Sequence, residues 1–215
     1  MKYLVFDTET TGLPKNYKPH GAKWFKDWPD IVQISWIMYD DELNDIVYVK
    51  DYIVKVDGDI PEASSSIHGI TNEISQMKGI PVMECLMDFR NSLFECDMII
   101  GHNISFDINV VKAQFLKQGA VDPFLLTKPL DVYCTMKETI NVCKIKAWSR
   151  RYNKYYYKWP KLIELHQVLF KTTPFGLHNS LTDILVTLRC FYKLKYDKDL
   201  HKLSTTFTQL AKDFI

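Results

Sequence analysis

The pattern of apolar and polar residues predicts that the first third of the chain is built from strands. Runs rich in branched and aromatic side chains predict strands at residues 2–7, 31–39 and 46–56. Residues 13–30, between the first two runs, are rich in Pro, Lys and Trp and predict a loop. Three strands in succession with modest connections indicate an antiparallel meander.

The spacing of apolar residues becomes helical in the rest of the chain, with short apolar runs in between. It predicts helices at residues 83–94, 104–117, 162–170 and 181–195, and strands at residues 98–101 and 130–134. A strand meander followed by alternating helices and strands predicts an α/β fold, in which helices flank a mixed sheet. We expect residues 1–196 to form one domain and residues 197–215 to add a helical extension to it.

The composition favours an intracellular protein that does not contact membranes. No run of about 18 apolar residues is present, and the apolar run after Lys2 stops at Asp7, too early for a signal peptide. The five cysteines are scattered without a Cys-x-x-Cys pair, which argues for reduced, mostly buried thiols and against structural zinc. The net charge of +1 is too small for a protein that coats nucleic acid, so any such contact needs a local basic patch.

Two acids, Asp7 and Glu9, stand at the end of the first predicted strand. Because side chains alternate along a strand, both face the same side as the apolar residues Tyr3 and Val5. Two like charges at the edge of an apolar face repel each other and resist burial. Three arrangements fit: one acid caps a following turn, both acids point to solvent, or a divalent cation binds both.

A third acid, Asp107, lies on the apolar stripe of the helix predicted at residues 104–117. Ile104, Ile108 and Val111 share this stripe through steps of three and four residues. An unpaired buried carboxylate is costly. Asp107 should therefore have a cationic partner, which is either a metal ion or a lysine or arginine.

The fourth acid, Asp183, lies at the start of the helix predicted from residue 181. Val186 and Cys190 give the side near Asp183 an apolar character, so we expect this helix to be buried on two flanks. Ser180-x-x-Asp183 also resembles a capping box, and for this acid alone capping is the favoured interpretation. His178 precedes the helix, where its ring can move, although a lone histidine usually has a structural role.

Taken together, these side chains occur in an order that resembles a known family. Asp-x-Glu, His-Asn-x-x-Phe-Asp and His-x-x-x-x-Asp follow one another as in the DEDDh, or DnaQ-like, 3′–5′ exonucleases. The resemblance is close to the proofreading branch, typified by the epsilon subunit of bacterial DNA polymerase III. The segments that carry it, between residues 2 and 195, are VFDTETTGL, IHGIT, GHNISFD, KLIEL and HNSLTDILVTLRCF.

The resemblance implies a ribonuclease-H-like fold and phosphodiester hydrolysis with two Mg²⁺ ions, for which Mn²⁺ is expected to substitute. It implies that Asp7 bridges both ions and that Glu9 and Asp183 complete the site that holds the attacking water. Asp107 would act on the other ion through waters. His178 would take the proton from the attacking water, since the ordinary pKa of a histidine, about 6.5, suits a base at neutral pH.

The resemblance also implies contacts to the substrate along three of these segments. They would touch the terminal sugar, wedge against its base, pack on the terminal nucleotide and orient the ligands. The expected contact residues are Thr8, Thr10, Thr11, Leu13, His68, Ile70, Asn103 and Phe106. For Leu13 and Ile70, an ordinary core position is an equally good interpretation.

Two further segments mix basic and aromatic residues. Residues 144–161 (KIKAWSRRYNKYYYKWPK) contain seven basic residues, six aromatic residues and no acid, and this segment is not part of the resemblance. Such a mixture suits single-stranded nucleic acid, with Arg150, Arg151 and Tyr155 as candidate contacts, but also suits a solvated loop that packs on the domain. Residues 15–28 would gate the site or contact a partner.

Three functions are compatible with the sequence. The leading one is a 3′–5′ exonuclease that acts on single-stranded or frayed DNA in proofreading or repair, because the DTETTG motif resembles the proofreading branch. The second is an exoribonuclease with the same chemistry. The third is a non-catalytic module that binds nucleic acid, but such a protein should have lost a metal ligand and none is missing. Because no polymerase domain is visible, a proofreading role would need a separate DNA polymerase.

Overall fold

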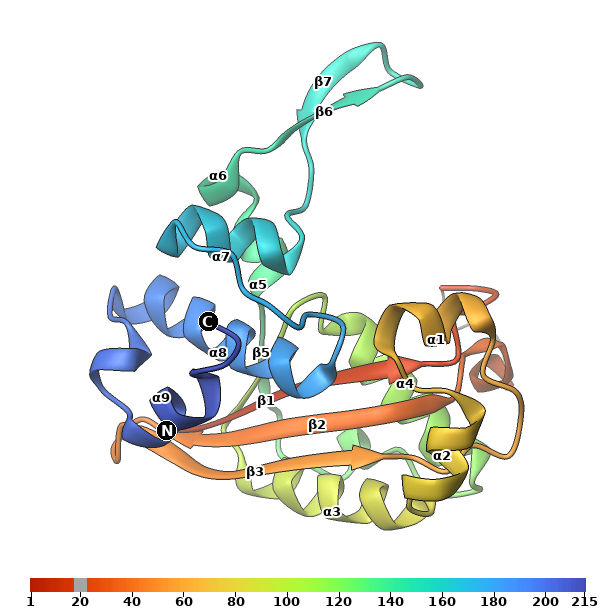
Figure 1. Ribbon diagram of the computed structural model, residues 1–215. Coiled ribbons are helices and arrows are strands. Elements are labelled where there is room, and N and C mark those ends of the chain that lie inside the picture. Colours follow the sequence, from red (N-terminus) through yellow and green to blue (C-terminus); the bar gives the residue numbers. More distant parts are fainter. Residues whose placement is uncertain (18–22) are drawn as a thin grey trace.

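The computed structural model describes residues 1–17 and 23–215, and a five-stranded mixed sheet forms its centre (Figure 1). Its strands are β1 (Lys2–Thr10), β2 (Ile31–Asp40), β3 (Asp45–Ile53), β4 (Met98–Gly101) and β5 (Asp131–Cys134). They lie in the order β3-β2-β1-β4-β5. The first three are antiparallel neighbours, whereas β4 runs parallel to both β1 and β5. The predicted mixed sheet with an antiparallel meander is confirmed.

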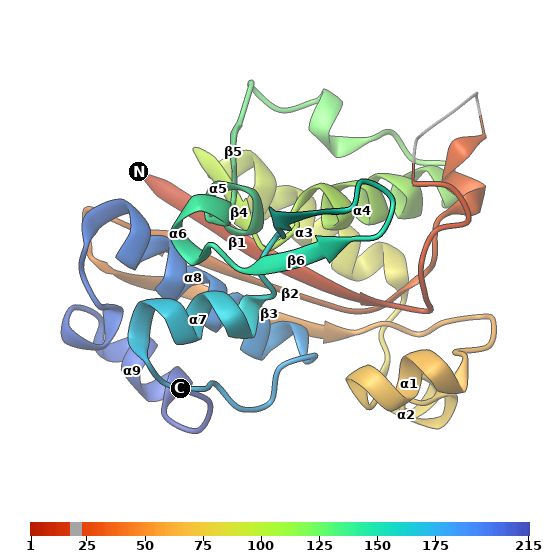
Figure 2. The same ribbon diagram turned by 90° about the horizontal axis from the view of Figure 1, so that it is seen from above.

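The other elements are helices and one hairpin. The α-helices are α1 (Glu62–His68), α2 (Asn72–Lys78), α3 (Val82–Glu95), α4 (Ser105–Lys117), α5 (Thr135–Glu138), α6 (Ile140–Cys143), α7 (Leu162–Phe170), α8 (Ser180–Tyr196) and α9 (Thr205–Ala211). Short 3₁₀ helices lie at η1 (Trp24–Asp27), η2 (Pro123–Leu125) and η3 (Leu200–Lys202). The strands β6 (Lys146–Ser149) and β7 (Lys154–Tyr157) pair as a hairpin that projects from the domain (Figure 1, Figure 2).

Side chains of the central strand alternate between two apolar cores. Leu4 and Phe6 of β1 pack in the core formed with α3 and α4. Tyr3 and Val5 point to the opposite face, where α8 and α9 cover the sheet. This alternation fixes which face of β1 each later residue of the strand presents. Asp7 and Glu9 therefore continue the face that is covered by α8.

Helix α8 is buried on two flanks, as its sequence predicts. Ile184 and Leu188 pack against the sheet, whereas Val186 and Cys190 pack against Leu165 of α7. The helix is held at its start by β2, because the Ser180 N–H donates to Gln33 Oε1 at 3.4 Å. The hydroxyl of Ser180 also bonds that of Ser35. These contacts bring the first turn of α8 to the end of β1.

One side of β1 is left open beyond Val5. Strand β4 pairs with residues 3–5 of β1 and ends at Gly101. The chain then turns sharply into α4, and a Cβ on Gly101 would lie 2.5 Å from the Ile104 side chain. Because only glycine tolerates that approach, Gly101 allows the first turn of α4 to lie beside the open half of β1.

The sequence did not predict α1, α2 or the β6–β7 hairpin. Each of these two helices has seven residues and buries only one of them, His68 in α1 and Ser75 in α2, so neither has an apolar stripe. All four residues of β7 are exposed, so the hairpin lacks the alternation that marks a half-buried strand. Strand β1 is also longer than predicted, reaches Thr10, and thus includes Glu9.

The five cysteines form no disulfide, and four of them are buried, which confirms the prediction from their spacing. In the part of the chain that the structure describes, no helix has the length and apolar character that crossing a bilayer requires. Helix α9 buries Phe207 and Ala211 in the same core as β1 and α8.

Candidate active site

Three carboxylates from two elements meet at the end of β1. Asp7 and Glu9 of β1 lie two residues apart on one face of the strand, and Asp183 reaches them from the first turn of α8. One oxygen from each of these carboxylates lies within 4.8 Å of the others. Of the three arrangements that the sequence leaves open for Asp7 and Glu9, the one in which both point freely to solvent is therefore wrong, since both side chains are partly buried close to a third acid.

Asp107 approaches the same strand from its open side. It lies in the first turn of α4, is 3 % exposed, and accepts hydrogen bonds from the Thr8 N–H at 3.1 Å and the Thr8 hydroxyl at 2.7 Å. The Asp107 carboxylate thus takes the place that a backbone partner from β4 would occupy if that strand were longer. Thr8 holds an acid in position, and its expected contact with substrate stays a prediction.

Asp183 does not form the capping box that its spacing from Ser180 suggested. Asn179 caps α8, because its side-chain oxygen accepts from the Leu181 N–H at 3.2 Å. The Asp183 carboxylate instead accepts from the His178 N–H at 3.1 Å. The capping-box interpretation is therefore wrong, and an oxygen of Asp183 lies within 4.8 Å of oxygens of Asp7 and Glu9.

The described residues offer the four acids no ion-pair partner. Among residues 1–17 and 23–215, no lysine, arginine or histidine forms an ion pair with any of them. Burial, together with repulsion from Asp183 and Asp107, raises the pKa of Glu9 to about 8. Burial also raises the pKa of Asp107 and of Asp183 to about 7. The pKa of Asp7 lies well above its usual range because of burial and repulsion from the three other acids.

This electrostatic arrangement fits a divalent metal. Buried carboxylates that raise each other's pKa are costly unless a cation neutralises them. Carboxylate oxygens are the ligands that Mg²⁺ and Mn²⁺ prefer. Asp7, Glu9 and Asp183 could hold such an ion directly, and Asp107, which is near enough to raise the pKa of Asp7, could act at the same site.

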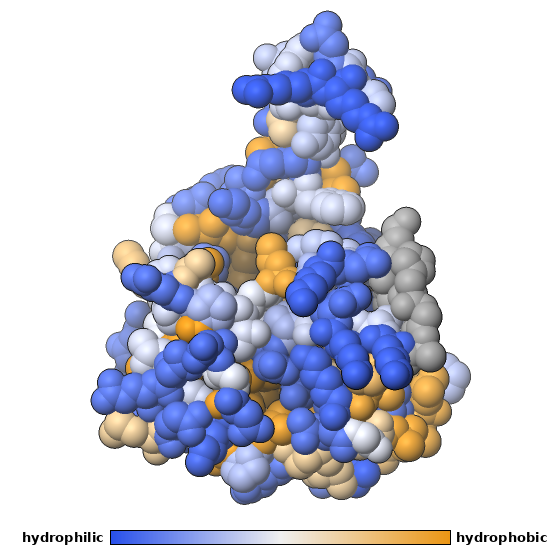
Figure 3. All heavy atoms as spheres, turned by 90° about the vertical axis from the view of Figure 1, so that its right-hand side faces the viewer, coloured by the Kyte–Doolittle hydropathy of each residue, from blue (hydrophilic) through white to orange (hydrophobic). Residues whose placement is uncertain are grey.

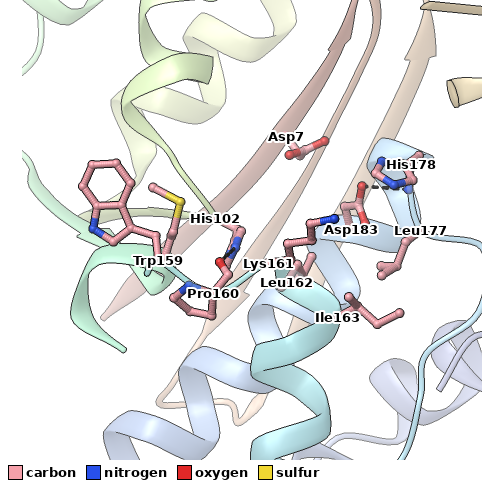
Figure 4. A pocket seen from close by; sticks show the side chains of 11 residues that line it. Asp7, His102, Trp159, Pro160, Lys161, Leu162, Ile163, Leu177, His178 and Asp183 are labelled. Atoms are coloured by element: carbon pink, nitrogen blue, oxygen red, sulfur yellow. Dashed lines mark hydrogen bonds between the residues drawn. The ribbon is translucent and has the colours of Figure 1, made fainter. Parts of the chain in front are cut away.

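His178 lies at the rim of the site and is exposed. Its backbone has a φ of 70°, in the left-handed region that few residues other than glycine adopt. This conformation reverses the chain just before α8 and sets His178 beside Asp183 (Figure 4). The position of the ring at a strained turn, next to the acids and open to solvent, suits a group that exchanges protons.

Asp7, His178 and Asp183 line a pocket of about 440 Å³ (Figure 4). The sequence did not predict the rest of its lining, which consists of His102, Met136, Trp159, Pro160, Lys161, Leu162, Ile163 and Leu177. Figure 4 shows the Lys161 side chain pointing toward Asp183. Two signals were available, because His102 lies in the GHNISFD segment and residues 161–163 lie in KLIEL.

His102 connects this pocket to the segment that carries the hairpin. Its Nε2 donates to the Pro160 carbonyl at 3.1 Å, and its Nδ1 bonds the Thr135 hydroxyl at 2.9 Å. Burial lowers the pKa of His102 to about 4, so the ring is neutral at physiological pH. A neutral imidazole with both nitrogens bonded is a structural link between β4, α5 and the wall of the pocket.

Four of the expected substrate contacts lie at the end of β1, in the turn after it and in α1. The Thr10 hydroxyl donates to the Gly12 carbonyl at 2.7 Å, and the Thr11 hydroxyl accepts from the Asp30 N–H at 3.0 Å. Leu13 is 73 % exposed, so the interpretation as a core residue is wrong. His68 is buried, and its Nδ1 accepts from the Ile70 N–H at 3.1 Å.

The remaining expected contacts divide between the core and a second hollow. Ile70 is 5 % exposed and packs with Val32, Val56 and Ile60, which is the core position that the sequence left open. Asn103 and Phe106 line a hollow of about 380 Å³ that adjoins the first pocket through shared residues Met136 and Trp159.

The basic and aromatic segment 144–161 divides between the hairpin and the pocket, because its last residues, Trp159, Pro160 and Lys161, line the pocket with Asp7 and Asp183. Arg150, Arg151 and Tyr155 belong to the projecting β6–β7 hairpin or its turn. Of the segment 15–28, residues 18–22 lie outside the described residues, so its expected gating role stays a prediction. Tyr17 and Trp28, at either end of it, line the same hollow as Phe106.

Comparisons with known proteins agree with this geometry. The model of the family RNase_T, described as exonuclease, matches residues 4–191. The chain is 31% identical over 133 residues to the PolC-type DNA polymerase III of Mycoplasma genitalium, a match that covers 61% of this chain and 8% of the polymerase.

Solved structures with the same fold include exonuclease I of E. coli. Its complex with a dT13 oligonucleotide has a TM-score of 0.66 at 17% identity, and the match covers 91% of this chain and 42% of that one. The zinc-ion-bound complex of E. coli exonuclease I with single-stranded DNA has a TM-score of 0.64 at 19% identity, covering 91% and 41%. These likenesses confirm the ribonuclease-H-like fold, and the chain spans about two fifths of these exonuclease chains.

Proposed function

The chain belongs to the exonuclease family RNase_T, and we propose on that basis that it is a metal-dependent 3′–5′ exonuclease. Its product would be nucleoside 5′-monophosphates, released one at a time from the 3′ end of single-stranded or frayed DNA. One observation carries the proposal: oxygens of Asp7, Glu9 and Asp183 lie within 4.8 Å of one another without a cationic partner among the described residues.

The acids supply the ligands for two divalent ions, Mg²⁺ or Mn²⁺. Bound there, the ions would polarise the scissile phosphate and lower the pKa of the attacking water. Asp7, whose pKa is raised by all three of the other acids, would contact both ions. Glu9 and Asp183 would complete one site, and Asp107, held by Thr8, would act at the other.

His178 would accept the proton of the attacking water. It lies beside Asp183, at the mouth of a pocket that also contains Asp7, and its exposed ring can turn toward a bound phosphate. The Asp183 carboxylate accepts from the His178 backbone N–H, which fixes the turn, while none of the described residues hydrogen-bonds the imidazole. A general base placed in this way typically contributes about 10²–10⁴-fold in rate.

The DNA substrate is supported by what the related proteins bind. The neighbours of matching fold are described in complex with dT13 or with single-stranded DNA, and the sequence relative is a DNA polymerase. We extend this to a proofreading or repair role inside the cell, with a separate DNA polymerase as partner. The domain would comprise residues 1–196, and the 197–215 segment would be a helical extension that docks on it through α9.

The test is hydrolysis of 5′-labelled 20-nucleotide DNA and RNA by the full chain with Mg²⁺, Mn²⁺ or chelator. We expect a ladder of one-nucleotide steps on DNA with either metal and none with chelator. The Asp7→Asn and His178→Ala variants should remove the ladder, while an exposed-surface variant, Glu73→Gln on α2, should retain it. A ladder on RNA alone would assign the exoribonuclease activity instead, and intact strands of both kinds would refute the proposal.

A further inference from the structure

The β6–β7 hairpin is an arm that the catalytic proposal leaves without a role. It projects beyond the helices that cover the sheet (Figure 1, Figure 2). The surrounding residues 144–161 carry seven basic residues and no acid, in a chain whose net charge is +1. Among the described residues, none of the cations Arg150, Arg151 and Lys154 forms an ion pair. The arm is therefore a local concentration of unneutralised positive charge.

One face of the hairpin is occupied by contacts within the hairpin itself. Trp148 lies directly opposite Tyr155, and their rings pack edge to face with centroids 4.9 Å apart. A two-stranded hairpin is marginally stable alone, and aromatic pairs across the strands stabilise it and fix its register. Trp148 and Tyr155 thus hold the arm together.

The other face is an open hollow lined by rings and a cation. Ser149, Lys154 and Tyr156 alternate onto this face, and Tyr152 extends it from the turn. Together they line a hollow of about 430 Å³. The guanidinium of Arg151 and the ammonium of Lys154 lie 5.4 and 5.9 Å from the centre of the Tyr152 ring. Positive charge therefore surrounds aromatic surfaces that are open to solvent.

Aromatic residues shared between neighbouring hollows link this hollow to the candidate active site. Tyr156 also borders a hollow of about 510 Å³ that Tyr157, Lys158 and Trp159 line at the base of the arm. Trp159 in turn lines the pocket that contains Asp7 and is 56 % exposed. In Figure 3 the projecting lobe is mostly hydrophilic and stands above a hollowed part of the domain. The aromatic surfaces thus form a path from the tip of the arm to the acids.

The base of the arm is fixed relative to the site. The Lys158 N–H donates to the Ile145 carbonyl at 2.9 Å, and the Lys158 ammonium bonds Glu164 of α7 at 2.6 Å. The Pro160 carbonyl accepts from His102, which lines the catalytic pocket. The arm therefore stands at a defined position above the pocket.

We propose that the β6–β7 hairpin binds the single strand of nucleic acid that lies 5′ to the terminal nucleotide. Bases stack on Tyr152, Tyr156 and Trp159, and the phosphates follow Arg150, Arg151 and Lys154. This inference rests on the proposed exonuclease activity, because that activity places the 3′ end in the pocket beside Trp159. A protein partner is disfavoured, since a protein interface has a contiguous apolar centre whereas cations separate these rings.

The length of the path predicts how many nucleotides it covers. From Trp159 back to Tyr152 the chain advances seven residues, or about 23 Å in extended form. A stacked strand rises about 3.4 Å per nucleotide, so the arm spans roughly seven nucleotides, and fewer when the strand is stretched. Oligonucleotides longer than this should use the arm, and a dinucleotide should not reach it.

The test compares hydrolysis of a 20-nucleotide strand with that of a dinucleotide. Three variants remove the proposed contacts: Tyr152→Ala with Tyr156→Ala, Arg150→Ala with Arg151→Ala, and replacement of residues 146–157 by an Asn-Gly turn. The last is feasible because Ile145 and Lys158 are already hydrogen-bonded at 2.9 Å. Phe94→Ala on α3 is the control for the exposed aromatic residues, and Lys198→Ala with Lys202→Ala is the control for the cations.

We expect KM for the 20-nucleotide strand to rise about tenfold or more in each hairpin variant, with hydrolysis of the dinucleotide unchanged. The controls should match the wild type on both substrates. Equal losses on both substrates would overturn the proposal, because the hairpin would then support the active site alone. Unchanged KM for the long strand would overturn it as well.

Binding distinguishes failure of this inference from failure of the catalytic proposal. Anisotropy of a labelled 20-nucleotide strand is measured with the Asp7→Asn chain, with and without the hairpin substitutions. Removing Arg150 and Arg151 should lower the slope of log Kd against log salt by about 0.7 for each phosphate that the variant no longer binds. If neither substrate is cut but the hairpin variants still weaken binding, only the catalytic proposal fails. An unchanged slope and Kd would overturn the role of the arm.

Discussion

The crowding of unpaired acids makes an unusual prediction: removing one of them should stabilise the protein when metal is absent. Glu9→Gln is the clearest case, because burial and repulsion from Asp183 and Asp107 raise the pKa of Glu9 to about 8. An unfolded glutamate titrates near 4.5. Between these values the folded state holds a proton that the unfolded state has lost. The stability of the metal-free wild type should therefore fall as the pH rises from 4.5 to 8.

The size of this change in stability follows from the shift in the pKa of Glu9. Each pH unit in this window costs about 1.36 kcal/mol for one such group. From pH 4.5 to pH 7 the contribution of Glu9 amounts to about 3 kcal/mol, or roughly 6–12 °C in Tm for a chain of this size. The neutral amide that replaces the Glu9 carboxylate in the variant does not incur this cost. In chelator at pH 7, Glu9→Gln should thus be about 3 kcal/mol more stable to unfolding than the wild type, and at pH 4.5 the difference should vanish.

The assay is urea unfolding followed by circular dichroism at pH 4.5, 6, 7 and 8, with chelator or with millimolar Mn²⁺. Mn²⁺ should stabilise the wild type more than the variant, because a ligand that binds only the folded state adds stability that increases with the logarithm of its affinity. Glu73→Gln, at an exposed position of α2, should change the stability by less than about 0.5 kcal/mol. A Glu9→Gln variant that is less stable than the wild type in chelator at pH 7 would refute the reasoning. So would a difference that does not depend on pH.

Three further changes test other contacts of the site. His178→Ala should lower kcat on single-stranded DNA by about 10²–10⁴-fold with little change in Tm, as measured by single-turnover kinetics and thermal unfolding, because the ring is exposed. Thr8→Val removes the hydroxyl that donates to Asp107 at 2.7 Å, and should cost about 1–3 kcal/mol of stability and reduce the affinity for Mn²⁺. Urea unfolding and calorimetry measure these two effects, and Thr8→Ser should retain both the stability and the affinity. The wild type should lose up to about 3 kcal/mol of stability as the pH falls from 6.5 to 4, because His102 has a pKa of about 4 in the folded state and the unfolded chain binds the proton more readily. His102→Gln should not show this loss. Acid unfolding of both chains measures the difference, and identical pH profiles would contradict the prediction.

The sheet and the main helices could be predicted because each carries a strong apolar pattern. Helix α7 begins and ends at the predicted residues, and α8 is buried on the two flanks that its sequence indicates. The short helices α1 and α2 could not be found in this way, because each buries a single residue and is held by turns and caps. The β6–β7 hairpin was missed for a related reason, since its exposed strands have no core side.

The candidate site was predictable in its residues more than in its geometry. The apolar periodicity predicts apolar surroundings for Asp7, Glu9 and Asp107, and an acid that breaks such a pattern marks a functional position. For Asp183, the spacing from Ser180 favoured a capping role, whereas in the structure Asn179 caps the helix. The pocket wall around Trp159 comes from the segment before α7. This segment is far from β1 in the sequence, so the sequence alone does not indicate that the two line one pocket.

Divalent ions bound at the end of β1 are the centre of the proposed mechanism, and anomalous scattering tests their presence most directly. Crystals of the full chain would be soaked with Mn²⁺ and a nucleoside 5′-monophosphate, and data collected at the manganese edge. We predict two peaks, both in contact with Asp7, one of them also bonded to Glu9 and Asp183. Their absence at saturating Mn²⁺, with Asp7, Glu9 and Asp183 still within 4.8 Å of one another, would contradict the account.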